Sequence, residues 1–168
     1  DSDSITAGDS LALGSGALIS ITGGLNDDTI TAATSGNITF NSSATLNIGG
    51  GAQDDRLILS PNVASFQDGL VSISGDSGDD IIEALNGLVV EGTKLTLSGG
   101  TENDYVSVTG STSIGAGGLV TIDGGSGNDT LSAATGDVTV EGGSELIFNG
   151  GGGNDFVTVT GNNVSVTG

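Results

Sequence analysis

One short motif recurs along the whole chain at a nearly constant interval, and this repeat constrains the fold more than any other feature. The copies read GGLNDDTI, GGAQDDRL, GDSGDDII, GGTENDYV, GGSGNDTL and GGGGNDFV, and they begin at Gly23, Gly50, Gly75, Gly99, Gly124 and Gly150. Their closing aspartates are Asp28, Asp55, Asp80, Asp104, Asp129 and Asp155. Asp3 continues the series backward by one more repeat. A fixed period of about 25 residues indicates an array of stacked structural repeats.

Apolar and polar residues alternate on both sides of each motif. The second and fourth residues after each aspartate are apolar in every repeat: Ile5, Ile30, Leu57, Ile82, Val106, Leu131 and Val157, then Ala7, Ala32, Leu59, Ala84, Val108, Ala133 and Val159. Apolar pairs such as Leu46 and Ile48 precede the motif, and a looser apolar segment lies between the two. Alternation with a period of two is typical of strands with one buried face. Each repeat therefore contains three short strands.

One such repeat cannot bury its apolar face alone, so the repeats must stack. We predict an all-β fold, a right-handed parallel β-helix with three faces, about 25 residues per coil and six to seven coils. Neighbouring coils would lie ~4.8 Å apart. Residues 1–168 are interpreted as a single solenoid domain that is a segment or subunit of a longer fibre. An antiparallel β-sandwich is the alternative, although it does not require identical phasing in every repeat.

The charge and the missing residue types exclude several functions. The chain has 21 acidic and 2 basic residues, a net charge of −19, and neither Cys nor His. Disulfides, thiolate zinc sites and imidazole catalysis are therefore excluded. Two cations cannot neutralise a row of phosphates, and no apolar run approaches the ~18 residues of a membrane span. We expect no nucleic-acid partner, no membrane insertion and no enzyme activity, because the only basic side chains, Arg56 and Lys94, lie on different coils.

Stacking would place the closing aspartates in a column with a spacing of about 4.8 Å. Two carboxylates at that distance repel each other by ~1 kcal/mol even in bulk water. The two basic residues cannot compensate for six or seven such groups. A folded stack therefore requires either raised carboxylate pKa values or a bound cation.

Two copies, GGSGNDTL and GGGGNDFV, resemble the GGxGxDxUx repeat of RTX (hemolysin-type) calcium-binding proteins. The resemblance implies Ca²⁺ between successive turns, with Asp129 and Asp155 as carboxylate ligands. It also implies backbone carbonyl ligands around Gly125, Gly127, Gly151 and Gly153, and equivalent ligands at Asp28, Asp55, Asp80 and Asp104.

The sequence departs from the RTX pattern in three ways, one of which is Asp76 at the second motif position of the third copy, where the pattern has Gly. The motif occurs once per long repeat and not at every nonapeptide, so an RTX-like corner on a wider helix is expected. The fourth motif position holds Asn26, Gln53 and Glu102 in three copies, and Gln and Glu adopt a left-handed turn less readily than Gly or Asn. Gly-Asn-Asp and Gly-Asp-Asp are also ordinary turn sequences, so a ladder of stacked side chains without metal is the alternative.

These features together predict a structural protein. We expect an extracellular, cell-surface or secreted β-solenoid that calcium stabilises and that forms part of a surface fibre, sheath or layer. Its coils would self-associate end to end into filaments, because exposed strand edges favour pairing. The alternatives are the stalk of a large secreted RTX-like adhesin and a calcium-dependent secretion or folding module of a secreted protein.

Overall fold

Successive repeats pair with each other through parallel strands. The computed structural model describes residues 1–59, 62–161 and 164–166. Within these ranges, both sheets contain only parallel pairs, and each pair joins equivalent segments of successive repeats. The period-two segments therefore stack in register, as predicted, and the antiparallel sandwich is wrong.

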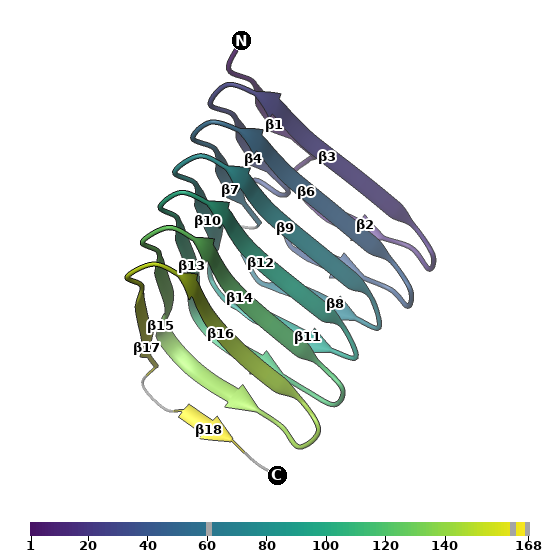
Figure 1. Cartoon of the computed structure of the whole chain (residues 1–168). Helices are drawn as coiled ribbons and strands as arrows, with labels where there is room; N and C mark the ends of the chain where they lie inside the picture. The colour runs from purple at the N-terminus through teal and green to yellow at the C-terminus, as the bar shows by residue number, and fades with distance from the viewer. Residues whose placement is uncertain (60–61, 162–163, 167–168) are drawn as a thin grey trace.

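The strands lie on three faces of the solenoid (Figure 1). The first face contains β1 (Ser4–Thr6), β4 (Thr29–Thr31), β7 (Arg56–Ile58), β10 (Ile81–Ala84) and β17 (Phe156–Thr160). The second face contains β2 (Leu11–Leu13), β5 (Ile38–Phe40), β8 (Ala64–Gln67), β11 (Leu88–Glu91) and β18 (Val164–Val166). The third face contains β3 (Leu18–Leu25), β6 (Thr45–Ala52), β9 (Leu70–Ser77), β12 (Lys94–Thr101), β14 (Leu119–Ser126) and β16 (Glu145–Gly152). The six strands of the third face agree with the expected six to seven coils.

Two longer strands join the first and second faces near the C-terminal end. They are β13 (Tyr105–Ile114) and β15 (Thr130–Val140). Strand β13 pairs with β10 through residues 105–108 and with β11 through residues 112–114. The register between β13 and β15 shifts between Gly110 and Thr112, where the chain changes face. The prediction of three separate strands per repeat is therefore wrong for these two coils, because one long strand covers both the first and the second face.

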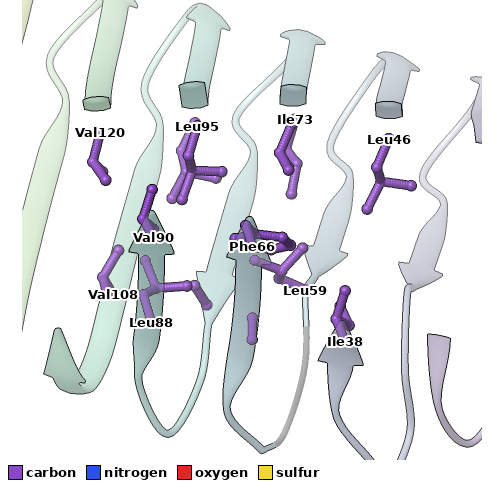
Figure 2. Close-up of a cluster of buried hydrophobic side chains, with 14 of the residues drawn as sticks. Ile38, Leu46, Leu59, Phe66, Ile73, Leu88, Val90, Leu95, Val108 and Val120 are labelled. Atoms are coloured by element: carbon purple, nitrogen blue, oxygen red, sulfur yellow. The ribbon is translucent and has the colours of Figure 1, made fainter. Parts of the chain in front are cut away.

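Apolar side chains from all three faces fill the interior. Figure 2 shows residues from successive coils in this core, among them Leu46, Ile73, Leu95, Val120, Ile38, Phe66, Leu88, Leu59 and Val108. The side chains are mostly aliphatic, and the rings of Phe40 and Phe66 meet edge to face with centroids 4.9 Å apart. Stacked small and aliphatic residues explain how so few aromatic residues suffice for a closed core.

The predicted inward positions are confirmed except in the end coils. The ten predicted residues in the repeats from Asp28 to Asp129 are buried: Ile30, Ala32, Leu57, Leu59, Ile82, Ala84, Val106, Val108, Leu131 and Ala133. In the first coil, Ile5 is partly buried and Ala7 is exposed. In the last coil, Val157 and Val159 are exposed because no further coil covers them. The right-handed sense stays a prediction from the crossover rule.

Nowhere in the described ranges is there a helix long and apolar enough to cross a membrane.

Candidate metal site

The closing aspartates of the motif form a column inside the solenoid. Five of them have only 1–3% of their surface exposed: Asp28, Asp55, Asp80, Asp104 and Asp129. The sixth, Asp155, belongs to the last coil and is partly exposed. The structure therefore brings together all six aspartates that the sequence singled out, one in each coil. Isolated buried carboxylates are costly, so the surroundings of this column decide its chemistry.

A tight turn after each third-face strand directs the aspartate inward. Strand β6, for example, continues through the first three motif residues and ends at Ala52, and the turn follows. The fourth motif residue is left-handed even where it is not glycine, with φ of 78° at both Gln53 and Glu102. Gln53 and Glu102 therefore adopt the left-handed conformation although these residue types do so less readily than Gly or Asn. The fourth residue keeps a positive φ in all six copies, from 77° at Asn26 to 145° at Gly127.

One carboxylate oxygen of each aspartate accepts a hydrogen bond from the preceding coil. The Asp28 N–H donates to Asp55 Oδ1 at 2.7 Å, and the Asp104 N–H donates to Asp129 Oδ1 at 2.8 Å. The same bond links the pairs Asp3 to Asp28, Asp55 to Asp80, Asp80 to Asp104 and Asp129 to Asp155 at 2.6–3.0 Å. The aspartates thus form a continuous ladder in which every donor precedes its acceptor along the chain. Hydrogen bonds of this kind favour the ionised carboxylate.

The second carboxylate oxygen has no hydrogen-bond partner. Five buried oxygens are in this state among the described residues: Oδ2 of Asp28, Asp55, Asp80, Asp104 and Asp129. Each lies against the first glycine of its own motif. A Cβ on Gly23 would lie 2.5 Å from Asp28 Oδ2 and 2.6 Å from the Gly50 carbonyl oxygen of the next coil. Glycine at this position therefore makes room for the carboxylate, which explains why all six copies begin with glycine.

Burial raises the pKa of these carboxyl groups. Desolvation is the largest cause, and it brings the pKa of Asp80 to about 6 and that of Asp104 to about 7. The pKa values of Asp55 and Asp129 are also raised, again chiefly by desolvation. The backbone hydrogen bond at Oδ1 acts in the opposite direction, and neighbouring carboxylates add a further rise. Without a cation, these four carboxyl groups therefore have raised pKa values, which is one of the two outcomes expected of a folded stack.

A second column of polar side chains lies outside the same corner. It consists of Asp27, Asp54, Asp79, Asn103, Asn128 and Asn154, each directly before an inward aspartate. Asp54 Oδ1 accepts from the Asp79 N–H at 2.9 Å, and Asn103 Oδ1 accepts from the Asn128 N–H at 2.9 Å. The side chains of this column are carboxylates in the N-terminal half and amides in the C-terminal half. An open hollow of about 530 Å³ lies along the acidic half, next to Glu102 and the three aspartates.

The glycines predicted as carbonyl ligands stack on one another in successive coils. Gly125 pairs with Gly151 in the third-face sheet, and the carbonyl oxygen of Gly125 faces Gly151 of the next coil. The carbonyl oxygen of Gly127 faces Gly153 in the same way. The carbonyl oxygen beside the Asp129 carboxylate is that of Gly150, which is the first glycine of the motif in the next coil. The invariance of this first glycine in all six copies was the signal that could have identified it.

The donor chemistry of the inner column fits a hard cation. It combines an unpartnered buried carboxylate oxygen with a backbone carbonyl oxygen, and Ca²⁺ prefers oxygen ligands of these two kinds. In the described part of the chain, no cluster of three or more carboxylates is arranged to hold a metal. At this corner each coil offers a cation one aspartate carboxylate and the neighbouring backbone carbonyl.

Comparisons with known protein families, with curated proteins and with solved structures found no match. The resemblance to RTX repeats therefore rests on the sequence motif alone.

Proposed function

We propose that the chain is a structural, extracellular β-solenoid whose corner binds calcium, and that it serves in a surface fibre, sheath or layer. The observation that carries the proposal is the column of five buried aspartates whose Oδ2 atoms have no partner. A buried carboxylate needs a proton or a cation to offset the loss of hydration. Millimolar calcium outside the cell matches the affinity of typical extracellular calcium modules, with Kd of ~10⁻⁴–10⁻³ M.

The aspartates and the first glycines of the motifs would hold the ion. Asp129 would contribute Oδ2, and Gly150 of the next coil would contribute its carbonyl oxygen. Bound calcium would supply positive charge that neutralises the carboxylate column. The chain's own contribution is to preorganise the oxygens, because the Oδ1 ladder fixes the orientation of every carboxylate before a cation arrives.

The uniformity of the solenoid supports a structural role over a catalytic one. The Arg56 guanidinium forms a surface ion pair with Glu83. The corners consist of short turns that repeat from coil to coil. The proposed partner is another coil of the same kind, added at the end of the stack.

Thermal unfolding followed by circular dichroism tests the calcium proposal. Calcium at one hundred times its Kd stabilises the folded state by ~2.7 kcal/mol for one site. For a domain of this size that corresponds to a rise in Tm of roughly 5–11 °C. Magnesium at the same concentration should have a smaller effect, because Mg²⁺ requires a stricter octahedral geometry.

Two variants with equal loss of charge localise the effect. Asp129→Asn removes an inner carboxylate, whereas Asp123→Asn removes an outward one in the same coil. We expect Asp129→Asn to reduce the calcium-induced rise in Tm and Asp123→Asn to retain it. Calorimetric titration with calcium should show the same difference in the number of bound ions. An unchanged Tm of the wild-type chain after chelation would refute the proposal.

A further inference from the structure

The outward side of the first face carries almost no charge, although the chain as a whole carries −19. Two rows of outward residues run along this face. The first row is Ser4, Thr29, Arg56, Ile81, Tyr105, Thr130 and Phe156, and the second row is Thr6, Thr31, Ile58, Glu83, Ser107, Ser132 and Thr158. Arg56 and Glu83 are the only charged residues in these two rows, and they pair with each other. The two rows therefore form a neutral strip of hydroxyl and apolar side chains.

Two large apolar side chains stand side by side at the centre of this strip. Ile81 and Tyr105 are direct partners in the register of β10 and β13, and each is 40% exposed. Both belong to interior coils, because Ile81 also pairs with Arg56 and Tyr105 also pairs with Thr130. Their exposure is thus a property of the outward register. Covering this pair with another surface would remove apolar area from water, which favours association.

The outer column of polar side chains borders the same strip, and its two halves differ in hydrogen-bonding character. Each member stands two residues before the first outward residue of its strand: Asp27, Asp54, Asp79, Asn103, Asn128 and Asn154. The carboxylates can only accept hydrogen bonds, whereas each amide carries two N–H donors. The ladder uses one of these donors, as where Asn128 Nδ2 donates to Asn103 Oδ1 at 3.1 Å. The second donor of each amide can therefore serve an acceptor outside the chain.

A two-fold axis that crosses the strip between Ile81 and Tyr105 would bring opposite halves of two copies together. A second copy laid face to face about this axis runs antiparallel to the first, so Ile81 of each copy covers Tyr105 of the other. Glu83 in the second row then faces Ser107. The outer column matches a carboxylate with an amide throughout: Asp79 with Asn103, Asp54 with Asn128 and Asp27 with Asn154. In this arrangement no carboxylate of the strip or of the outer column faces another carboxylate.

We propose that this strip and the outer column together bind a second copy of the chain, laterally and antiparallel. The third face is less suited to a partner of the same charge, because its outward rows carry the carboxylates of Asp123 and Glu145. Since both copies use the same surface, the contact closes as a dimer. It is separate from the addition of coils along the stack, and it uses none of the proposed calcium ligands.

The size of the contact predicts a reversible dimer. The coils from Thr29 to Phe156 would overlap, over a length of ~29 Å and a width of ~16 Å. Such an interface buries roughly 1,000 Å² in total, which is near the lower limit for a specific contact. The two copies still repel each other through charges elsewhere, so sodium chloride should strengthen the dimer by screening them.

An exchange of carboxylate and amide tests the arrangement by analytical ultracentrifugation in calcium chloride and sodium chloride. Asn128→Asp would place a carboxylate opposite Asp54 of the second copy, and the symmetry would repeat this repulsion once more in the same dimer. We expect the Kd of the dimer to rise roughly tenfold or more. Adding Asp54→Asn to the same chain restores one carboxylate opposite one amide at the wild-type net charge. We expect this double variant to dimerise like the wild type, and circular dichroism should be unchanged in both variants.

Asn37→Asp is the matched control, because it adds the same charge at an exposed position next to β5 on the second face. It should leave the Kd of the dimer nearly unchanged, whereas Tyr105→Glu at the centre of the strip should abolish the dimer. Equal Kd values for Asn128→Asp and Asn37→Asp would overturn the proposal, and so would a double variant that stays monomeric. A wild-type chain that stays monomeric at high protein and salt concentration would overturn it too. Oligomers that grow beyond the dimer equally in all variants would assign the association to another surface and refute this one.

Discussion

The stability of the calcium-free solenoid should fall as the pH rises, and Asp80 provides the sharpest test. Burial raises the pKa of Asp80 from 3.8 to about 6. The folded chain therefore holds a proton on Asp80 at pH values at which the unfolded chain has lost it. Stability that depends on this proton is fully present below the unfolded pKa and is lost as the pH rises through the folded pKa. The difference in pKa corresponds to roughly 3 kcal/mol of unfolding free energy.

Adjacent residues offer a matched pair of variants for this prediction. Asp80→Asn removes the titrating group while keeping an oxygen that accepts the Asp55 N–H. Asp79→Asn makes the same change of charge one residue earlier, on the exposed outer column, where Asn103 shows that an amide fits. Any cost of burying the amide is the same at every pH. The quantity to compare is therefore the difference in stability between acidic and neutral solution, not the absolute stability.

The measurement is thermal or urea unfolding in chelator between about pH 4 and about pH 8. We expect Asp80→Asn to remove roughly 3 kcal/mol of the fall in stability, equivalent to about 6–12 °C in Tm for a domain of this size. Asp79→Asn should retain the wild-type fall apart from a small effect on net charge. A wild-type chain that becomes more stable as the pH rises over this range would refute the reasoning. An equal response of both variants would refute it as well.

Two further predictions concern packing. Leu131 is fully buried, so Leu131→Asp should lower the free energy of unfolding in urea by several kcal/mol. Thr130 lies on the outward side of β15, so Thr130→Asp should be tolerated. A larger loss of stability from Thr130→Asp than from Leu131→Asp would contradict the strand register. A methyl group on Gly124 would clash with Asp129 Oδ2 and the Gly150 carbonyl oxygen, whereas a methyl group on Gly152 would meet open space. Gly124→Ala should therefore lower Tm clearly, and Gly152→Ala should leave Tm nearly unchanged. Equal Tm values for the two alanine variants would show that the aspartates do not occupy the space above the first glycines.

The repeat and its alternation were sufficient to predict the architecture, because each inward position recurs in several coils. Ile82 and Leu131, for example, hold the same position in their repeats, and both pair in register with Val106 and are buried. The second face was harder to predict. Thr112 is buried there, at 5% exposure, although its side chain is polar. Ala64 is also buried, but its small side chain adds little to an apolar pattern in the sequence. Their positions follow from pairing with Leu88 of β11, a contact that lies between coils and not within one repeat.

The candidate site was only partly predictable. The spacing of the motifs placed the closing aspartates in one column, but it did not show that they are buried while the residue before each of them is exposed. In the triplets GDD and NDD, the last two positions both carry aspartate, as at Asp79 and Asp80. The difference arises from the left-handed turn before them, which directs one side chain into the core and the other to the solvent. That turn also explains why the first glycine, and not the second or fourth, lies beside the buried carboxylate.

The two halves of the outer column should respond differently to electrolyte. From Asn103 onward, amide side chains donate to one another along the axis, as Asn128 Nδ2 does to Asn103 Oδ1 at 3.1 Å, and such ladders are insensitive to ionic strength. The carboxylates of Asp27, Asp54 and Asp79 can only accept, so they repel their neighbours with a strength that dissolved ions screen. Along a single axis, the outer column therefore joins an acidic segment whose mutual repulsion weakens as salt is added to an amide segment whose hydrogen bonds do not change.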